Sequence, residues 1–140
     1  MKIVLGIDGS KVSFRAVAWC AQYGGALGAE VIATHAVELP VYPSTVGFVP
    51  MPVYLPADRE KLQKLLVDEW CDPLAKAKVP FRPLLLEGNP AEVIRDTADE
   101  EDADLVVVGR RGLGGFAEVL LGSTSHYLSH HLKRPFLIIS

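Results

Sequence analysis

Short apolar runs alternate with segments of helical periodicity along most of this chain. Several of the runs lack the polar alternation of a half-exposed strand, which is typical of parallel strands covered on both faces. Strand–helix alternation of this kind predicts an α/β fold with a doubly wound parallel sheet and helices on both faces. The runs expected to form strands are Lys2–Ile7, Glu30–Val37, Phe81–Leu86, Asp104–Val108 and Pro135–Ile139.

Two of the expected helices carry an apolar stripe at helical spacing. The first is predicted near Val12–Leu27, with Ser10 as its N-cap. The second is predicted near Ala57–Asp72, where Pro73 should stop or kink it. The side chains expected on the two buried faces are Phe14, Val17, Ala18 and Ala21, and Leu62, Leu65, Leu66 and Trp70.

Start patterns mark two further helices. Asn89-Pro90-Ala91-Glu92 combines a capping residue, a proline at the first helical position and an early glutamate, so we expect a helix from here to about Glu100. The last helix should follow Gly122 and carry the chain to His131.

The segment 38–56 breaks this rhythm. Its core, Leu39 to Pro56, holds five of the ten prolines and is too long for an ordinary connection. We interpret it as a proline-rich insertion, a variable and partly extended surface loop. The alternative is a lid or docking surface, because four large apolar side chains there are costly to leave in water: Tyr42, Phe48, Met51 and Tyr54.

Composition limits the possible classes of protein. A chain of 140 residues is one domain, and 49% hydrophobic residues are too many for a disordered chain. The net charge of −3 argues against a nucleic-acid-binding surface. No apolar run approaches the roughly 18 residues of a membrane helix, and Asp8 interrupts the first run before a secretory signal could form. We therefore expect a cytoplasmic protein.

The two cysteines, Cys20 and Cys71, have no Cys-x-x-Cys spacing and no metal-ligand pattern. In a reducing compartment they should pack as small apolar side chains inside helices.

The most informative stretch follows the fourth apolar run: Gly109-Arg110-Arg111-Gly112, nine residues, then Gly122-Ser123. Glycines let the backbone turn sharply and bring its N–H groups close to a ligand. Gly122-Ser123 stands where a helical pattern begins, so amide donors and the positive end of the helix dipole would face one spot. A strand end, a glycine loop and a helix start together predict an anion-binding site, most simply for phosphate.

Known phosphate motifs do not account for this stretch. It lacks the Lys-Ser/Thr of a Walker loop and the G-x-G-x-x-G of a dinucleotide fold. A tight turn with structural glycines is the alternative and would explain Gly114 and Gly115. Asp8-Gly9-Ser10 ends the first expected strand, and it would share a crevice with Gly109 if the two strands are neighbours at the point where the winding reverses.

These residues resemble the universal stress protein family. The spaced motif is Gly109, Gly112, Gly122 and Ser123, supported by Asp8-Gly9-Ser10 and by Glu87-Gly88-Asn89-Pro90. The likeness covers nearly the whole chain. It implies that residues 1–140 form a single domain. It implies a Rossmann-like α/β domain with five parallel strands that usually forms homodimers. In members with the full spacing it also implies bound ATP, with which we expect Mg²⁺.

The resemblance also implies roles for single positions. It places the phosphates against Gly109, Gly112, Gly122 and Ser123, and the adenosine near Asp8 and the backbone of Ala36. Val108 and Thr124 flank the same loops. Arg110 stands where a small hydroxyl residue is common, and Arg110 and Arg111 either pair with the polyphosphate or are solvated. The expected nucleotide-binding residues are Asp8, Ala36, Val108, Gly109, Arg111, Gly112, Gly122, Ser123 and Thr124.

Asp8 and Ser123 also have structural interpretations: Asp8 could cap its own turn, and Ser123 could be only a helix cap. His35 near the end of the second strand is interpreted as structural.

Three other features are interpreted as structural. His126, His130 and His131 should form an exposed or dimer-facing surface, since a third metal ligand is not evident. The acidic run Asp99-Glu100-Glu101-Asp102 should be a solvated helix end. Trp19 and Trp70 are expected in the core or at a subunit contact.

The leading hypothesis is a homodimeric ATP-binding protein of stress response or signalling, a regulatory module whose bound state an unknown protein partner reads. The final run, Phe136-Leu137-Ile138-Ile139, would leave an edge strand that a second subunit covers. We expect neither nucleic acid nor a membrane as partner. Two alternatives stay open: a slow ATPase or phosphotransferase, against which the lack of a paired base and nucleophile counts, and a nucleotide-free dimerisation module.

Overall fold

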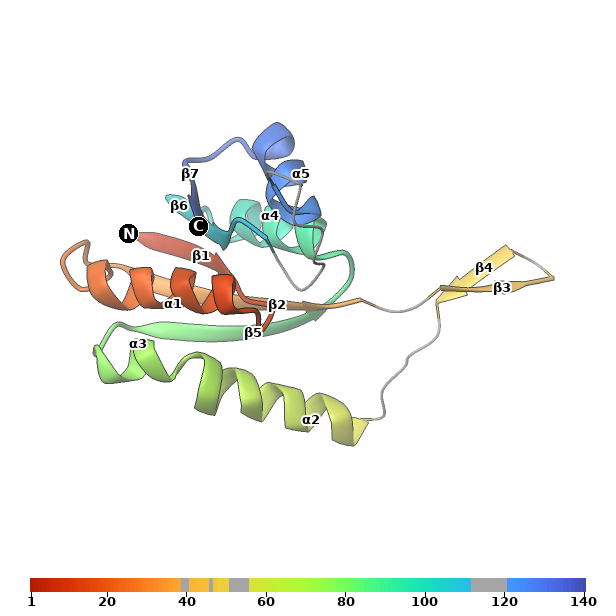
Figure 1. The fold of residues 1–140 in the computed structure, drawn as a ribbon, viewed down its shortest axis with the longest axis horizontal. Helices are drawn as coiled ribbons and strands as arrows, with labels where there is room; N and C mark the ends of the chain where they lie inside the picture. The colour runs from red at the N-terminus through yellow and green to blue at the C-terminus, as the bar shows by residue number, and fades with distance from the viewer. Residues whose placement is uncertain (39–40, 46, 51–55, 112–120) are drawn as a thin grey trace.

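The five apolar runs form one parallel sheet, as predicted (Figure 1). A computed structural model describes the chain except residues 39–40, 46, 51–55 and 112–120. Each strand begins and ends within one residue of its expected bounds. The strands are β1 (Lys2–Gly6), β2 (Glu30–Val37), β5 (Phe81–Glu87), β6 (Leu105–Gly109) and β7 (Phe136–Ile139).

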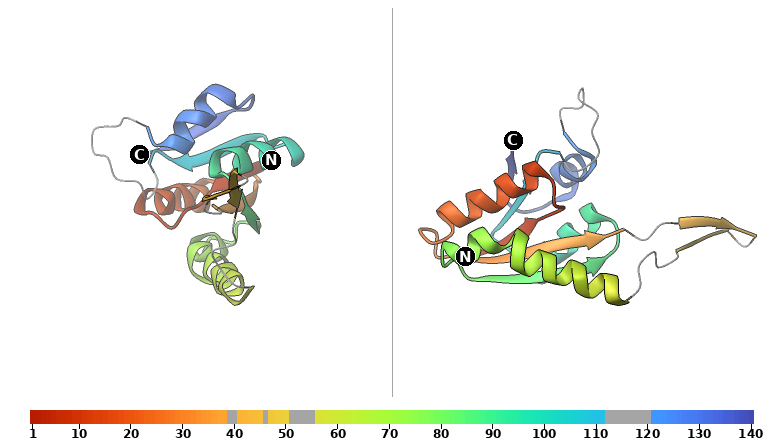
Figure 2. Two further views of the ribbon diagram at one scale, coloured as in Figure 1. Left: turned by 90° about the vertical axis from the view of Figure 1, so that its right-hand side faces the viewer. Right: turned by 60° about the horizontal axis from the view of Figure 1, so that its bottom comes forward.

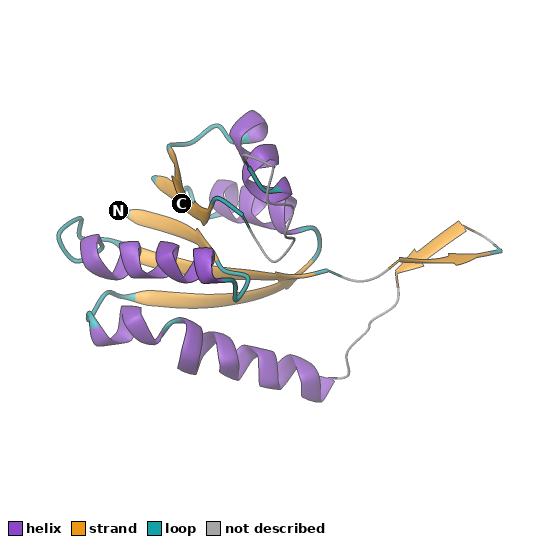
Figure 3. Cartoon of the chain, in the orientation of Figure 1, coloured by secondary structure: helices purple, strands orange, loops and turns teal. Residues whose placement is uncertain are grey.

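The strand order is β5-β2-β1-β6-β7, and all neighbours are parallel. The chain winds outward from β1 to one edge, then returns to the other side of β1 to place β6 and β7. The winding therefore reverses between β1 and β6, which pair in register from Ile3 opposite Leu105. The doubly wound, Rossmann-like α/β fold is confirmed, with helices on both faces of the sheet (Figures 2 and 3).

Alternate residues of β1 supply the two hydrophobic cores. Ile3 and Leu5 face α1 (Lys11–Tyr23) and α3 (Asp72–Lys76), whereas Val4 faces α4 (Pro90–Glu100) and α5 (Ser123–His131). All three side chains have no exposed surface. A strand buried on both faces needs apolar residues at every position, which explains why β1 shows no polar alternation.

Helix α1 begins where Ser10 predicted, because the Ser10 Oγ accepts a hydrogen bond from the Ser13 amide at 3.1 Å. Its buried face differs from the expected one. Phe14 is 37% exposed and Ala18 is exposed. Small side chains let this helix lie close to the sheet, and the residues that it buries are Ser13, Ala16, Val17 and Cys20.

The second expected helix is divided into three parts. Helix α2 (Pro56–Leu65) runs into a π-helical turn, η1 (Leu66–Trp70), and α3 follows after Cys71. The helical run ends at Trp70, just before Pro73, so the predicted stop is confirmed. Pro73 itself lies in the first turn of α3, where its missing N–H is not required. Of the expected stripe, Leu66 is fully buried and Trp70 is half-buried.

The last two helices follow their predicted starts. The Asn89 Oδ1 accepts hydrogen bonds from the amides of Ala91 at 3.0 Å and Glu92 at 3.3 Å. Helix α5 ends at His131 as expected. Its N-cap is Gly122, however, so Ser123 is the first helical residue and the interpretation of Ser123 as the cap was wrong.

Two short strands lie within the proline-rich segment 38–56. β3 (Val41–Ser44) and β4 (Gly47–Pro50) pair antiparallel, with Ser44 opposite Gly47. Gly47 has a φ of +115°, a conformation that glycine adopts readily at a tight turn. Figure 1 shows this hairpin standing apart from the five-stranded sheet. The predicted loop thus has secondary structure of its own, and Met51 and Tyr54 lie outside the described residues.

Both cysteines are free and fully buried in the core that α1 covers. Burial raises the pKa of the Cys20 thiol to about 12 and that of Cys71 to about 11. Because thiolates are the reactive form, both side chains act as small apolar residues, as predicted. Cys71 lies between η1 and α3 and not inside a helix.

The acidic run at the end of α4 is exposed at Asp99, Glu100 and Asp102, as predicted, and it also forms ion pairs that the sequence did not indicate. Arg134 forms ion pairs with Asp99 at 3.2 Å and Asp102 at 3.0 Å. Glu101 pairs with Arg82 at 2.8 Å and Lys2 at 3.3 Å. These partners come from distant segments, so the sequence pattern alone could not reveal them. No helix within the described ranges is long and apolar enough to cross a membrane.

Candidate functional site

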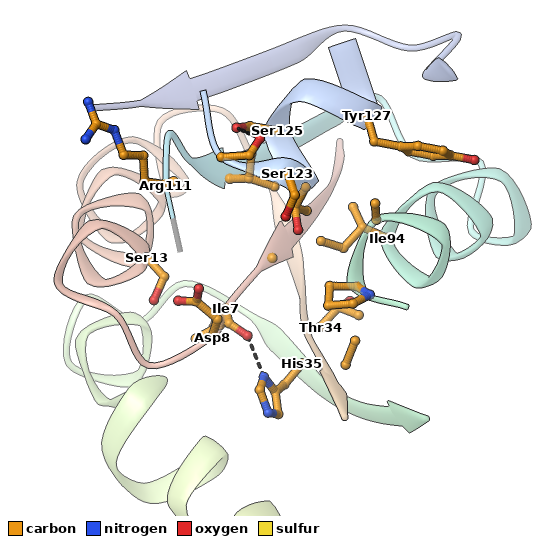
Figure 4. A pocket seen from close by; sticks show the side chains of 18 of the residues that line it. Ile7, Asp8, Ser13, Thr34, His35, Ile94, Arg111, Ser123, Ser125 and Tyr127 are labelled. Carbon is orange, nitrogen blue, oxygen red and sulfur yellow. Dashed lines mark hydrogen bonds between the residues drawn. The ribbon is translucent and has the colours of Figure 1, made fainter. Parts of the chain in front are cut away.

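A cavity of about 600 Å³ opens at the carboxyl ends of β1, β2 and β6 (Figure 4). It lies at the point where the winding of the sheet reverses, between β1 and β6. The first turns of α4 and α5 complete its wall. In open α/β sheets this is the position where ligands bind, because the loops there diverge to opposite faces and leave a crevice.

The structure brings the sequence-predicted binding residues together in this cavity. Gly112 lies outside the described residues, as do Gly114 and Gly115. All the others line the cavity: Asp8, Ala36, Val108, Gly109, Arg111, Gly122, Ser123 and Thr124. They come from the ends of three strands and the start of one helix, and the parallel arrangement places all of these at the same edge of the sheet.

Hydrogen bonds fasten the end of β6 to the start of α5. The carbonyl of Arg110 accepts from the Gly122 amide at 2.8 Å and from the Ser125 Oγ at 2.7 Å. The Arg110 amide donates to the carbonyl of Ile139 at 2.7 Å. Arg110 and Gly122, with eleven residues of sequence between them, thus meet through a main-chain hydrogen bond. The N-terminus of α5 is held at the mouth of the cavity.

The helix N-termini around the cavity differ in how their amides are satisfied. Ser10 caps α1 and Asn89 caps α4, each with its own side chain. Gly122, the N-cap of α5, has no side chain, and no side-chain capping bond is formed there. First-turn amides have no acceptor within the helix, so those of α5 stay available for an external anion.

Gly109 has a packing role that the sequence argument did not anticipate. A Cβ added there would lie 2.9 Å from Val12 Cγ1, 3.0 Å from the Val12 carbonyl carbon and 3.1 Å from the Ser13 amide nitrogen. The absent side chain therefore allows β6 to end directly against α1. The requirement for glycine at this position comes from helix–strand packing, although its backbone lines the cavity.

Asp8 forms the turn after β1. Its Oδ1 accepts a hydrogen bond from the Ser10 amide at 2.9 Å, which is the capping role expected for it. The same residue lines the cavity. The turn uses one carboxylate oxygen, so the structural and the ligand-binding interpretations are compatible.

His35 is tied to the backbone, as its structural interpretation predicts. It lies two residues before the end of β2, and its Nδ1 is 2.7 Å from the carbonyl oxygen of Ile7. Because a carbonyl only accepts, Nδ1 is the donor in this bond. The His35 ring meets the ring of Trp70 edge-on, with centroids 5.1 Å apart.

Arg110 and Arg111 both line the cavity. Figure 4 shows the Arg111 side chain directed away from Asp8 and Ser123. In this conformation the guanidinium does not extend toward the centre of the cavity, so contact with a polyphosphate would need another rotamer.

Sequence reasoning missed part of the cavity wall. The missed part comes from Thr34 in β2, from the start of α4 and from Tyr127 in α5. Tyr127 belongs to it, with its hydroxyl 2.5 Å from Arg95 Nη1 and its ring stacked on His131 at 4.1 Å. The start pattern of α4 at Asn89 was visible in the sequence and could have indicated this wall. The missed lining residues include Thr34, Asn89, Pro90, Ile94 and Tyr127.

The histidines of α5 form an exposed surface. The rings of His126 and His130 lie 4.8 Å apart, and neither ring lines the cavity. Within the described part of the chain there is no group of three or more metal-ligating side chains.

Comparison with known proteins gives a consistent result. Residues 1–140 match the profile of the universal stress protein family. The Thermus aquaticus "Universal stress protein in QAH/OAS sulfhydrylase 3'region" is 35% identical over 143 residues, which cover 98% of this chain and 96% of that protein. Universal stress protein Sll1388 of Synechocystis is 58% identical over 52 residues, 37% of this chain and 34% of that protein.

A solved structure of a universal stress protein in complex with cAMP has the same fold. It matches with a TM-score of 0.73 and 28% identity, and the match covers 99% of this chain and 95% of that one.

Proposed function

This chain belongs to the universal stress protein family, and we propose that it is a regulatory module whose cavity binds ATP. One observation carries the proposal: a cavity at the reversal point of the sheet faces the N-terminus of α5, which, unlike those of α1 and α4 among the described residues, no side chain caps. The cAMP complex of a structural relative supports an adenine nucleotide as the ligand. Nucleotide binding here would stabilise one arrangement of the β6–α5 connection for a partner protein to recognise.

The two ends of the cavity suit different parts of the nucleotide. The triphosphate would lie against Gly109 and the first-turn amides of Ser123 and Thr124, where the helix dipole favours negative charge. The adenosine would lie near Asp8 and the backbone of Ala36. In this orientation the carboxylate of Asp8 is kept away from the phosphates.

Magnesium would be held mainly by the nucleotide itself. Among the described residues, Asp8 and Glu38 are the carboxylates that line the cavity, and no cluster of three metal ligands occurs. Mg²⁺ keeps several waters and is often bound through one or two carboxylates together with substrate phosphates. The residues present fit a Mg²⁺ ion that arrives with ATP, and the ion would neutralise part of the triphosphate charge.

Two polar groups in the cavity that could act as a catalytic base are already hydrogen-bonded within the protein, which favours nucleotide binding over hydrolysis. Asp8 Oδ1 is used by its own turn, and His35 Nδ1 is bonded to Ile7. A hydrolytic site needs a base positioned on a water or on another nucleophile. ATP hydrolysis that disappears in Asp8→Ala would contradict the binding-only role and favour an ATPase.

The test is nucleotide content followed by titration. Protein purified without added nucleotide is denatured, and the supernatant is analysed for adenine nucleotides. Stripped protein is then titrated with ATP, and with GTP as a control, by calorimetry. We expect ATP to bind in preference to GTP. The absence of binding at millimolar ATP, weaker than roughly −4 kcal/mol, would refute the proposal.

A matched pair of variants assigns the role of Asp8. Asp8→Asn keeps an oxygen that can accept from the Ser10 amide, whereas Asp8→Ala loses both the turn and the charge. If the carboxylate contacts the nucleoside, Asp8→Asn should weaken ATP binding with little change in the free energy of unfolding. Equal ATP affinity in Asp8→Asn and the wild type would remove Asp8 from the site.

A further inference from the structure

Trp70 lies just outside the cavity, at the end of the π-helical turn η1. The Cys71 amide donates to the carbonyl of Leu66 at 3.0 Å, which is the wide spacing of a π turn. The ring of Trp70 is half-buried against the first core and meets Phe14 edge-on at 6.3 Å. Turns of this kind are rare and occur often near functional sites, so the contacts of Trp70 toward the cavity are informative.

The first such contact is with Gly9, which follows Asp8. A Cβ built on Gly9 would lie 2.7 Å from Trp70 Cζ2 and 3.1 Å from Cη2. Gly9 also has a φ of +79°, so both its conformation and its closeness to the indole require glycine. The turn that carries Asp8 therefore packs directly on the Trp70 ring.

The second contact is with His35, which is bonded to Ile7, the residue before Asp8. The two rings are edge-to-face, 88° apart in plane and 5.1 Å between centroids. His35 Nδ1 in turn donates to the Ile7 carbonyl at 2.7 Å, and the Ile7 amide donates to the Thr34 carbonyl at 2.9 Å. The indole thus supports Gly9 directly and Ile7 through His35.

We propose that Trp70 is a positioning residue for the adenosine end of the cavity. Its indole fixes the residues on either side of Asp8 and thereby the orientation of that carboxylate. The ring also joins this turn to η1 and α2, so it would respond to occupancy of the cavity. Where the ligand is ATP, the inference rests on the function proposed above, but the support of the turn by Trp70 does not.

The first experiment needs no ligand. Trp19 is a matched control, because it is also a half-buried tryptophan on the same core, and it contacts Tyr23 and does not line the cavity. Amide hydrogen exchange is measured at Ser10, whose N–H bonds to Asp8, in Trp70→Leu and Trp19→Leu. After correction for global stability, we expect faster exchange in Trp70→Leu alone. Equal exchange in the two variants would overturn the proposal.

The second experiment measures ATP affinity by calorimetry in the same variants. Trp70→Leu should weaken binding about tenfold, corresponding to ~1.4 kcal/mol, and Trp19→Leu should stay within about twofold of wild type. Trp70→Phe, which keeps a flat ring, should restore part of the affinity. Unchanged affinity in Trp70→Leu would contradict the proposal. If wild-type protein itself fails to bind ATP, the proposed function fails and the exchange experiment still decides the role of Trp70.

A third measurement keeps the native Trp70 side chain, in case Trp70→Leu does not fold. The chain has two tryptophans, so Trp19→Phe leaves Trp70 as the sole one. Addition of ATP to this variant should shift or quench its emission. Constant emission while calorimetry records binding would show that Trp70 does not sense the cavity, and the proposal would fall.

Discussion

Gly122 illustrates how one residue can leave a site open for a ligand. Its backbone has φ −70° and ψ 164°, a conformation that any residue adopts, so glycine is not required there by geometry. Serine, asparagine or aspartate at this position would satisfy the first-turn amides of α5 with its own side chain. The absence of that side chain is what keeps the amides available.

Gly122→Asp should therefore act in opposite directions on stability and binding. The new carboxylate would cap α5 and interact with its dipole, raising the free energy of unfolding by about 0.5 kcal/mol. It would also occupy the amides and repel phosphate, so ATP affinity should fall at least about tenfold. Urea denaturation and calorimetry measure the two effects, with Gly122→Ala as the control that adds a methyl group and no acceptor. Retained affinity in Gly122→Asp would exclude this helix end from the phosphate site.

At the scale of elements, the cavity depends on how closely β6 and α1 approach. The last residue of β6 lies against the first turn of α1, and only a residue without a side chain fits between them. The same contact positions Ser13, which lines the cavity, next to the strand end. Packing between these two elements and the shape of the site are therefore linked.

Gly109→Ala should destabilise the fold through this contact. The added methyl group meets backbone atoms of Val12 and Ser13, which cannot move aside without shifting α1. Overpacking of this kind costs ~1–3 kcal/mol. The control is Gly25→Ala, because a Cβ at Gly25 meets nothing within 4 Å. Urea denaturation should show a clear loss of stability for Gly109→Ala alone, and similar midpoints for both variants would contradict the packing role.

At the scale of the whole molecule, the two edges of the sheet differ. At one edge, Arg59 of α2 donates from Nη2 to the carbonyl of Leu85 in β5 at 3.0 Å. At the other edge, the amides of Val106 and Arg110 donate to the carbonyls of Pro135 and Ile139. Alternation along β7 then directs the amides of Phe136 and Ile138 away from β6. An apolar strand with outward-facing donors can pair with a second copy of the chain.

We predict a homodimer through β7. Ile138→Pro would remove an outward-facing donor while leaving the bonds to β6 in place, since proline is tolerated on an edge strand. Sedimentation at micromolar concentration should give a dimer for the wild type and for Ile138→Val, and a monomer for Ile138→Pro. A monomeric wild type would sink the prediction.

The free energy of unfolding should also depend on pH through Glu101. This residue directly follows α4 and pairs with Lys2 of β1 and Arg82 of β5. Its hydrogen bond from Arg82, followed by that from Lys2, holds the pKa of this carboxyl below its ordinary value. A lowered pKa in the folded state adds stability above the ordinary value of about 4.3, and this stability is lost as the pH falls through the folded pKa.

The check compares Glu101→Gln with the wild type by urea denaturation from pH 6 to pH 3. The wild type should be more stable at pH 6, by less than about 1 kcal/mol because the pair is partly exposed. This advantage should shrink toward pH 3. A difference that is constant over the whole range would mean that the charge of Glu101 contributes nothing.

The local sequence pattern alone was enough to predict the helices and strands, and to predict that the site lies at the carboxyl ends of the parallel strands. Apolar runs predicted every strand of the parallel sheet, and Ser10 and Asn89 predicted where helices begin. These features depend on neighbours within a few residues, such as a cap and the amide that it accepts from. Because parallel strands all end at one edge, residues after those strands were certain to gather there.

Tertiary structure decided whatever depends on partners distant in sequence. The buried face of α1 is set by how closely the sheet approaches, which favoured Ala16 and Cys20 over Phe14. Position 109 requires glycine because Val12 lies too close for a side chain. Asp99 and Glu101 form ion pairs with Arg134 and Arg82, which are far from them in sequence. Trp70, at the end of the π turn, packs on the cavity loop at Gly9, a residue far from it in sequence. The hydrophobic periodicity of a helix or strand indicates which of its faces is buried on average. The contacts between elements are fixed only when the whole chain has packed.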